Sequence, residues 1–383
     1  MRPLRIGFVS VDDLDQINLW SGIPRSIWKH LEQEPVELVK LSPLSRAYRH
    51  LLLPQRVIGK LRGKSALSDR HPAALWSFAR QIRKRLDANP VDVVFAPSSI
   101  PITWLRCRQP VVFWTDAVWH GYRDYYGVKV GRLDDWLAKR QERQALERAT
   151  FAVYASSWAA EQAARLTRSD KIRVLPFGSN LPVSHAAPAI TEMTSARLSR
   201  MQRQLTLLFV GVSWERKGGE VAVEAVRLLN QRGTPARLKL VGCKAPRALP
   251  DFVEDLGFVD RSTTSGLEQL TELYRQSDLF ILPTKAEAAG IVFCEASAFG
   301  LPILTYATGG TVDYVRQNVN GLALPAGSSP EAFAQAASAL VANSEHYMEL
   351  SQRAFAEYEQ RLNWRSSVHS LTELLRESCD RRT

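Results

Sequence analysis

The sequence predicts an α/β protein with two doubly wound parallel-sheet domains. Apolar strands alternate with amphipathic helical stretches in both halves of the chain. Its 383 residues are too many for one ordinary core and suit two domains of similar size. A stretch rich in Pro, Ser, Ala and Thr separates the halves at residues 181–204. We therefore expect domains at 1–180 and 181–360, followed by a helical segment at 361–383.

The first half begins with a continuous apolar strand, a polar loop and a helix, in the order of a Rossmann unit. Its loop lacks the Gly-x-Gly-x-x-Gly fingerprint of dinucleotide-binding proteins. Helices are expected at 21–31 and 132–149. Strands are expected at 4–11, 36–41, 91–97, 111–115 and 151–155, with a last strand beginning at residue 171.

The second half repeats the same βα scheme. Short buried strands are expected at 206–211, 238–242 and 278–282, and the last of them ends at Pro283. Helices are expected at 220–230, 269–276 and 290–300, and a long helical tail at 330–379.

Two glutamates eight residues apart follow the strand at 278–282. Glu287 is expected on the loop at the carboxyl end of this strand, and Glu295 about a turn and a half inside the next helix. Backbone amides at a helix N-terminus suit phosphate oxygens, and carboxylates accept hydrogen bonds from sugar hydroxyls. The loop therefore fits a phosphorylated, polyhydroxyl ligand, with one acid on the reacting sugar and the other on a nucleotide's ribose. The alternative is a pair of ordinary solvated acids.

A glycine-lined turn with adjacent cations follows the first strand of the second half. Gly211 ends the strand, and Arg216 and Lys217 precede Gly218-Gly219 at the start of a helix. Such a turn suits a diphosphate, because backbone amides and fixed cations approach it together.

The stretch from Pro283 to Ala296 resembles the Glu-x7-Glu signature of retaining glycosyltransferase family 4. This family has the GT-B fold, in which two Rossmann-like domains face each other across a cleft and the last helix crosses back to the first domain. The resemblance covers most of the C-terminal half and is specific to the family, but not to a substrate. It extends to Pro176-Phe177-Gly178, Phe209-Val210-Gly211, Gly300-Leu301-Pro302, Gly309-Gly310 and Asn320-Gly321-Leu322.

The resemblance implies a role for each matching residue. Glu287 would orient the donor sugar, Glu295 would hold the ribose hydroxyls, and Lys217 occupies the position of the phosphate-binding lysine. The other implied donor contacts are Gly211, the amides of Gly290 and Ile291, the backbone near Phe258 for the base, and Gly22 for the phosphates. A plain helix-start glycine is the alternative for Gly22.

The sequence departs from the family at two positions. Val212 stands where the family has an arginine, and we expect Arg216 to replace that guanidinium from another direction. Asp116 stands at a strand end where the family has a histidine that touches the donor sugar, and His120 comes only later. Asp116 is expected to accept a hydrogen bond from a sugar hydroxyl or the acceptor, with helix capping as the alternative. His120 is expected to be a surface or packed residue.

The resemblance implies a retaining, metal-independent hexosyltransferase that uses a nucleotide diphosphate-sugar and no cofactor. Its acceptor would be a glycan or lipid-linked molecule in bacterial polysaccharide or glycolipid biosynthesis, held mainly by the N-terminal domain. Asp13-Leu14-Asp15 matches the Asp-x-Asp of metal-dependent transferases, but a three-residue match is weak and GT-B enzymes do not need it. The alternatives are a GT-B epimerase or phosphorylase, and a non-catalytic nucleotide-sugar-binding scaffold.

Positive charge is concentrated in the region 41–90, which has eleven Lys or Arg against two Asp, a net charge of +9. With its apolar residues, including Tyr48, Leu52 and Val57, it suits an anionic membrane surface. A solvated helical face is the alternative; a nucleic-acid partner is not expected.

The protein is expected in the cytoplasm, with possible peripheral attachment to the inner face of the membrane. No apolar run approaches the roughly 18 residues of a membrane span. The N-terminal segment is interpreted as a strand and not as a signal peptide. The four cysteines lie far apart, which argues against a zinc site and a disulfide framework and fits a reducing compartment.

Overall fold

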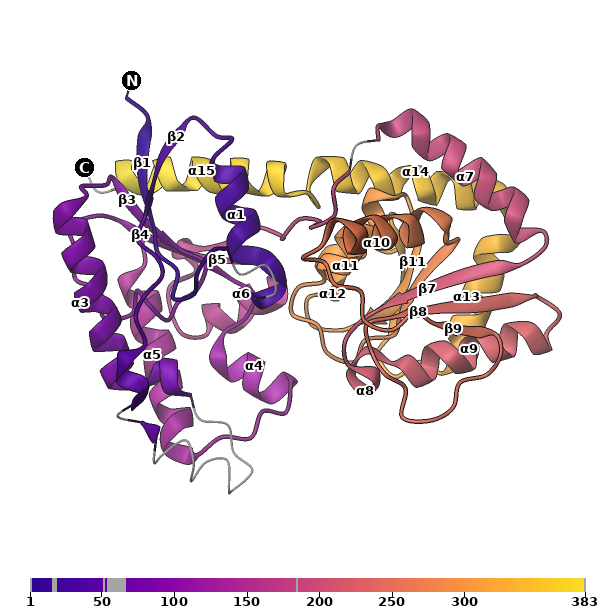
Figure 1. Cartoon of the computed structure of the whole chain (residues 1–383), viewed down its shortest axis with the longest axis horizontal. Helices are drawn as coiled ribbons and strands as arrows, with labels where there is room; N and C mark the ends of the chain where they lie inside the picture. Colours follow the sequence, from indigo (N-terminus) through magenta and orange to yellow (C-terminus); the bar gives the residue numbers. More distant parts are fainter. Residues whose placement is uncertain (1, 16–18, 51, 54–66, 184, 382–383) are drawn as a thin grey trace. The chain divides into compact units, whose positions relative to one another are not determined.

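The computed structural model describes residues 2–15, 19–50, 52–53, 67–183 and 185–381. The chain folds into two compact units (Figure 1). Unit 1 comprises Met1–Leu175 and Ser367–Thr383, and unit 2 comprises Pro176–Ser366.

The described residues of unit 1 form a six-stranded parallel sheet in the order β2-β1-β3-β4-β5-β6. The central strands are buried along their whole length, which is why they are apolar without alternation. The strands are β1 (Leu4–Phe8), β2 (Val36–Lys40), β3 (Val93–Ala96), β4 (Val111–Thr115), β5 (Phe151–Tyr154) and β6 (Ile172–Val174).

Helices cover both faces of this sheet. Since parallel crossovers are right-handed, the helices between β2 and β3, β4 and β5, and β5 and β6 share one face, and α1 lies on the other. The helices are η1 (Leu19–Gly22), α1 (Ile23–Leu31), η2 (Ala47–His50), η3 (Ser68–Arg70), α3 (Pro72–Ala88), α4 (Trp119–Tyr125), α5 (Arg132–Arg148), α6 (Ser157–Ala164) and η4 (Ser169–Lys171).

Unit 2 has a second six-stranded parallel sheet, in the order β12-β11-β10-β7-β8-β9. The order turns back between β7 and β10, and ligands of open α/β sheets bind at such a point, at the carboxyl ends of the strands. The strands are β7 (Leu205–Val210), β8 (Ala236–Val241), β9 (Val253–Asp255), β10 (Leu279–Leu282), β11 (Ile303–Ala307) and β12 (Gly321–Pro325).

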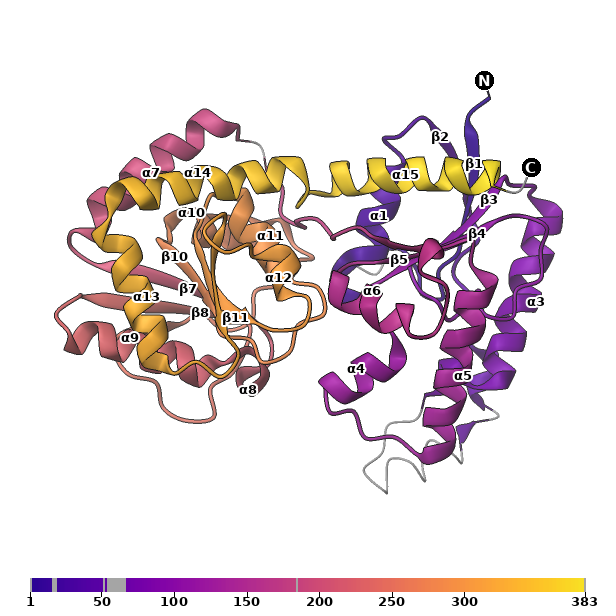
Figure 2. The ribbon, with the colours of Figure 1, turned by 180° about the vertical axis from the view of Figure 1, so that it is seen from behind.

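The helices of unit 2 also lie on both faces of its sheet. The crossover rule places α10, α11 and α12 on one face, while α9 lies on the other and packs against α13 (Figure 2). The helices are α7 (Ala187–Met201), α8 (Trp214–Lys217), α9 (Gly219–Gln231), α10 (Thr264–Gln276), α11 (Ile291–Ala298), α12 (Thr311–Tyr314), α13 (Pro330–Ala342) and α14 (Ser344–Gln360).

The tail predicted as one helical region at 330–379 consists of three helices: α13, α14 and α15 (Trp364–Asp380). Asparagines mark both breaks. The side chain of Asn343 accepts a hydrogen bond from the His346 amide (2.9 Å), and that of Asn363 accepts one from the Ser366 amide (2.9 Å). An asparagine that caps the next helix in this way also ends the previous one. Residues of α15 from Ser367 onward belong to unit 1.

Candidate active site

Two loops at the carboxyl edge of the unit 2 sheet are held tightly together. One is the turn α8–Gly218–α9 after β7, and the other begins at Pro283 after β10. The Lys285 amide donates to the Arg216 carbonyl (2.8 Å), and the Arg216 guanidinium donates through Nη1 to the Ala286 carbonyl (2.9 Å). Arg216 therefore helps to fix the loop that carries Glu287.

Lys217 and Glu287 form a buried ion pair between these loops. Each residue is only 8% exposed. Gly211 makes room for the lysine, because a Cβ at this position would lie 3.0 Å from Lys217 Cγ. The Glu287 carbonyl accepts a hydrogen bond from the Gly310 amide (2.8 Å), which fixes the loop from its other side. Four residues predicted for the site, Gly211, Arg216, Lys217 and Glu287, are thus brought together.

Helix α11 begins just after this loop, at Ile291, with Gly290 as its N-cap. No side chain caps this end with a hydrogen bond in the described structure. Helix N-termini with uncapped amides attract anions, since their N–H groups and the helix dipole favour negative charge. The predicted role of Gly290 and Ile291 in phosphate binding is compatible with this geometry and stays a prediction.

Glu295 lies in α11 with its side chain fully buried. Arg261 donates two parallel hydrogen bonds to its carboxylate, Nη1 to Oε1 (2.6 Å) and Nη2 to Oε2 (3.1 Å). The Tyr274 hydroxyl donates a third to Oε2 (2.9 Å). Burial and the Glu295 charge raise the pKa of Tyr274 well above its usual value, so this hydroxyl stays a donor. The predicted contact of Glu295 with ribose stays untested, and in this structure its carboxylate is engaged by protein donors.

Phe258 lies in the loop between β9 and α10 and is 70% exposed. The preceding Gly257 has a left-handed backbone (φ 63°), and its carbonyl accepts a hydrogen bond from the Gly242 amide (2.8 Å) at the end of β8. Val212, which replaces the arginine of the family, is 69% exposed. Exposed apolar side chains therefore lie in the loops after β7 and β9, at the edge where the site is predicted.

In unit 1, Asp116 and Gly22 are linked through Trp20. Asp116 directly follows β4 and is half-buried, and its Oδ2 accepts a hydrogen bond from Trp20 Nε1 (3.0 Å). Trp20 and Ser21 have left-handed backbones, and Gly22 (φ 76°) is the N-cap of α1. His120 is half-buried in α4, and burial lowers its pKa.

Sequence reasoning missed Trp20, Arg261 and Tyr274. Arg261 resembled an ordinary loop residue, and Tyr274 lies in a helical pattern that suits core packing. Both reach Glu295 from more than twenty residues away in the chain, and no local pattern encodes that contact.

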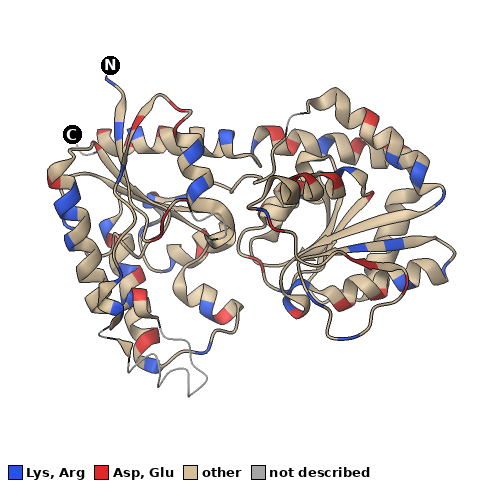
Figure 3. Ribbon diagram, viewed as in Figure 1, with Lys and Arg blue, Asp and Glu red and all other residues tan. Residues whose placement is uncertain are grey.

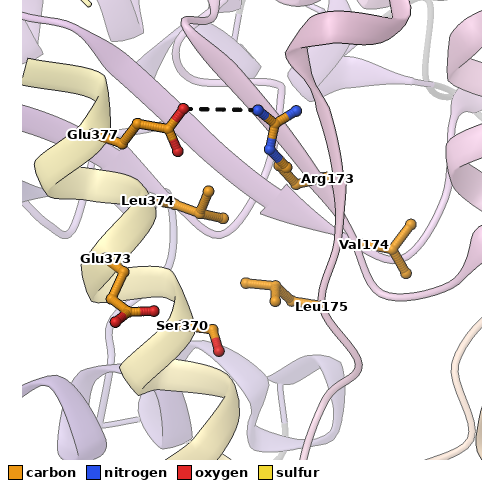
Figure 4. A pocket seen from close by; sticks show the side chains of 7 residues that line it. All are labelled: Arg173, Val174, Leu175, Ser370, Glu373, Leu374 and Glu377. Atoms are coloured by element: carbon orange, nitrogen blue, oxygen red, sulfur yellow. Dashed lines mark ion pairs between the residues drawn. The ribbon is translucent and has the colours of Figure 1, made fainter. Parts of the chain in front are cut away.

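The part of the chain that the structure describes contains no group of three or more His, Cys, Asp or Glu side chains placed to bind a metal. A separate pocket of unit 1 lies between β6 and α15 and contains none of the predicted site residues (Figure 4). An Arg173–Glu377 ion pair (3.8 Å) lies at this pocket. Its lining consists of Arg173, Val174, Leu175, Ser370, Glu373, Leu374 and Glu377.

Two family models match the chain, one in each half. Residues 27–181 match the model described as Glycosyltransferase Family 4, and residues 192–357 match Glycosyl transferases group 1. Together the matches cover most of the chain, including every predicted donor-site residue except Gly22.

The chain is similar to known bacterial glycosyltransferases. It is 28% identical to a D-inositol 3-phosphate glycosyltransferase of Streptomyces griseus, over 54% of this chain and 46% of that protein. It is 33% identical to the lipopolysaccharide glucosyltransferase WaaG of Escherichia coli, over 39% of this chain and 41% of that protein. The chain thus spans about half the length of the curated relatives that it matches.

Solved structures of low sequence identity share the fold over nearly the whole chain. A sucrose-phosphate synthase of Thermosynechococcus elongatus superimposes with a TM-score of 0.69 at 18% identity, covering 98% of both chains. The HepE protein of Anabaena, in complex with UDP, superimposes with a TM-score of 0.66 at 15% identity, covering 98% of this chain and all of that one. These structures and the two parallel sheets confirm the predicted fold. The chain belongs to glycosyltransferase family 4 and has the GT-B fold.

Proposed function

We propose that the protein is a retaining glycosyltransferase that moves a hexosyl group from a nucleotide diphosphate-sugar to a glycan or lipid-linked acceptor. The observation that carries this proposal is the buried Lys217–Glu287 pair at the carboxyl edge of the unit 2 sheet. A buried ion pair is costly to desolvate and contributes little net stability. Its place at the carboxyl edge of the sheet, where open α/β sheets bind their ligands, therefore argues for a functional role. The HepE protein of Anabaena, which has the same fold, was solved in complex with UDP-glucose and with UDP, and this supports a nucleotide-sugar donor.

Unit 2 would bind the donor, with the diphosphate near Lys217 and the first amides of α11. As the glycosidic bond breaks, negative charge grows on the leaving phosphate, and fixed cations and amides stabilise it where it develops. Glu287 would accept a hydrogen bond from a hydroxyl of the donor sugar and stabilise the positive charge that develops on its ring. The acceptor, held mainly by unit 1 with Asp116 as a hydrogen-bond acceptor, would attack from the face that the phosphate leaves. Its proton would pass to the departing phosphate oxygen.

We place the reaction in bacterial polysaccharide or glycolipid biosynthesis, because the matched relatives include a lipopolysaccharide glucosyltransferase. A scaffold without activity is the second candidate, since Val212 and Asp116 replace two residues of the family pattern. An epimerase or phosphorylase of the same fold would reveal itself by forming product without an added acceptor or with free phosphate.

The test is a binding screen of the purified chain against UDP-, GDP- and ADP-sugars, with and without EDTA. We expect one nucleotide class to bind, with the same affinity when EDTA is present, and sugar transfer to appear when candidate acceptors are added. Binding that EDTA abolishes would contradict a metal-independent donor site. Binding without transfer to any acceptor would favour the scaffold, and failure of all three nucleotides to bind would contradict the proposal.

We further propose that unit 1 docks on an anionic membrane surface through α3 and α5, at the inner face of the membrane. Both helices carry the same exposed pattern, a tryptophan followed by arginines four and seven residues later: Trp76, Arg80 and Arg83 on α3, and Trp136, Arg140 and Arg143 on α5. Each tryptophan lies under the first of its arginines, with 5.4 Å from the guanidinium carbon to the ring centroid.

The two helices belong to the same face of the sheet, and η3 contacts both. In Figure 3, Lys and Arg are drawn in blue, and blue segments occur along both α3 and α5. Tryptophan prefers the headgroup level of a bilayer and arginine attracts anionic lipids, so this surface suits a bilayer better than a nucleic acid. Within region 41–90, Arg46 and Arg49 pair with Asp69. Tyr48 and Leu52, which were predicted to face the membrane, are instead buried in the hydrophobic core of unit 1. Residues 51 and 54–66, with Val57, Ile58 and Leu61, lie outside the described residues. No helix among the described residues is long and apolar enough to cross a membrane.

Vesicle sedimentation tests this docking surface. We expect the chain to bind vesicles that contain phosphatidylglycerol and not vesicles of phosphatidylcholine alone. The variant R80Q/R140Q should bind about thirtyfold more weakly, at about 1 kcal/mol for each cation near the surface, and W76A/W136A should also lose binding. R232Q/R353Q is the control, because it removes the same charge from exposed positions of unit 2. Equal losses in the control would show non-specific charge attraction and contradict the surface, as would tighter binding of an oligonucleotide than of the vesicles.

A further inference from the structure

Four aromatic side chains form a row at the carboxyl edge of the unit 1 sheet. Helix α4 follows β4 and helix α6 follows β5, and the two helices lie side by side (Figure 2). The ring centroids of Tyr122 on α4 and Tyr126 just after α4 lie 4.7 Å apart, and Tyr125 lies 5.3 Å from Tyr126. Tyr125 in turn lies 4.7 Å from Trp158, at the start of α6. We call these four side chains the aromatic row.

The aromatic row is open to solvent and is not enclosed in the core. Tyr122 is 39% exposed, and the other three residues are half-buried. The hydroxyl of Tyr122 makes no hydrogen bond within the described residues. Single exposed apolar residues are ordinary, but a contiguous group of them marks a surface that binds something.

The rings are held in place at both ends of the row. Trp158 packs with one side against the core of unit 1. At the other end, Tyr122 lies 6.3 Å from the buried Trp119, centroid to centroid. The indole Nε1 of Trp119 donates to Asp135 Oδ1 (2.9 Å), and the guanidinium of Arg70 lies over its ring, 5.2 Å from the centroid. A ligand that binds to the row therefore has little side-chain freedom to remove.

The charges beside the row favour a neutral ligand. Arg123 and Asp124 are the two Lys, Arg, Asp or Glu residues of α4, and they pair with each other. Arg123 also pairs with Asp135 on α5. Helix α6 adds one exposed glutamate, Glu161, and no cation. The tryptophans of the membrane surface proposed above differ, because each lies under an arginine. Anionic headgroups and phosphates thus find their partners on α3 and α5 and not on the aromatic row.

Among neutral ligands, a sugar ring suits three tyrosines and a tryptophan better than a lipid chain does. The flat faces of the aromatic rings pack against the C–H groups of a sugar, while the tyrosine hydroxyls can donate to and accept from its hydroxyls. An alkyl chain would cover those hydroxyls without giving them a hydrogen-bond partner, which is unfavourable.

The location of the row agrees with this choice. Open α/β sheets bind their ligands at the carboxyl ends of the strands, and both helices of the row begin there. Asp116, to which we assign a hydrogen bond with the acceptor, directly follows β4 and lies three residues before Trp119 at the start of α4.

We propose that the aromatic row binds a neutral sugar ring of the acceptor. This inference rests on the proposed function, because it names a contact of the same acceptor. It makes the saccharide part of the acceptor, and not a lipid or phosphate, the part that unit 1 recognises through α4 and α6. The row touches no reacting atom, so it determines affinity and specificity for the acceptor.

The test measures the binding of four neutral trisaccharides, built from glucose, mannose, galactose and N-acetylglucosamine, to the purified chain by saturation-transfer NMR titration. We expect at least one of them to bind. Tyr122→Leu and Trp158→Leu should each bind it about two- to tenfold more weakly, the range of one aromatic contact. Tyr122→Phe keeps the flat face and should stay within about twofold of the wild type, since the lost hydroxyl can be replaced by water.

Trp28→Leu is the matched control. It removes another half-buried tryptophan of unit 1, which packs edge-on against Phe8 (5.3 Å) on α1, the helix on the opposite face of the sheet. This variant should bind the trisaccharide as the wild type does. All variants should bind the nucleotide equally, because unit 2 holds the donor, and their unfolding temperatures are measured in parallel. Equal losses of trisaccharide affinity in Trp28→Leu and Trp158→Leu would overturn the inference.

A lipid probe separates the two neutral or partly neutral halves of a lipid-linked acceptor. Farnesyl phosphate that binds more tightly than every trisaccharide, and is lost in Tyr122→Leu, would assign the row to a lipid and overturn the inference. If a nucleotide binds in the donor screen but no trisaccharide does, only this inference fails. If no nucleotide binds while a trisaccharide depends on Tyr122 and Trp158, the proposed function fails and the aromatic row remains a sugar-binding surface.

Discussion

Glu287→Gln is expected to lower the turnover number of the transferase by about a hundred- to a thousandfold, the range found when one preorganised electrostatic contact to a transition state is removed. The affinity for the nucleotide should not fall. The substitution keeps the shape of the side chain, and its amide oxygen can still accept a hydrogen bond from Lys217. It removes the negative charge that would stabilise the donor sugar as its glycosidic bond breaks.

The buried ion pair between Lys217 and Glu287 determines whether Glu287→Gln raises or lowers the affinity for the nucleotide. In the wild type the carboxylate of Glu287 offsets the cation of Lys217, and both residues are only 8% exposed. With a neutral partner the lysine attracts a diphosphate more strongly, so nucleotide affinity should stay equal or rise while turnover falls. Such a split indicates a residue that acts mainly on the transition state.

The measurements are the turnover number at saturating donor, the dissociation constant of the nucleotide, and the unfolding temperature. Glu349→Gln is the control, because it removes the charge of an exposed glutamate that pairs with Arg353 on α14 (3.2 Å). Exposed pairs contribute little, so this control should change none of the three quantities appreciably. Parallel losses of turnover and nucleotide affinity in Glu287→Gln would contradict the role assigned to Glu287.

The strands of unit 1 and β7, β8 and β10 of unit 2 were predicted, whereas β9, β11 and β12 were not. The central strands were predictable because they are buried in parallel sheets. A strand covered on both faces must be apolar throughout, as at 279–282 and 111–115, and such runs are visible without any knowledge of their neighbours. The loop with Glu287 and the turn with Lys217 were predictable for a related reason, since each follows a recognisable strand. Parallel strands bring their carboxyl ends to one edge of the sheet.

The environment of Glu295 was not predictable in the same way. Its distance from Glu287 in the sequence indicates a helix position, but its burial depends on which side chains of other elements reach it. Arg261 comes from a loop 34 residues earlier, and Tyr274 from a helix 21 residues earlier. Similarly, nothing near Asp116 in the sequence indicates that Trp20, 96 residues earlier, donates to it. Contacts of this kind are set by packing and not by local spacing.

Gly218→Ala is expected to lower the free energy of unfolding of unit 2 by about 2–5 kcal/mol and to weaken donor binding. Gly218 has a left-handed backbone (φ 76°), which costs about 1–2 kcal/mol for any other L-residue. In addition, a Cβ at this position would lie 2.1 Å from the Pro283 carbonyl oxygen. Backbone must move to relieve that contact, at a further cost of about 1–3 kcal/mol.

The backbone movement that Gly218→Ala requires would also disturb the predicted donor site. Gly218 immediately follows Lys217, and Pro283 begins the loop that carries Glu287, so separating the two backbones also separates the ion pair. Gly233→Ala is a matched control in the same unit, because Gly233 is also left-handed (φ 82°) but a Cβ there would meet nothing within 4 Å. The free energy of unfolding of Gly233→Ala should fall only by the cost of the left-handed backbone, about 1–2 kcal/mol. This variant should bind the donor as the wild type does. Unfolding by denaturant gives the stabilities and titration with the nucleotide gives the affinities. If both alanine variants lose stability and affinity equally, close contact of the two loops is not what holds Lys217 against Glu287.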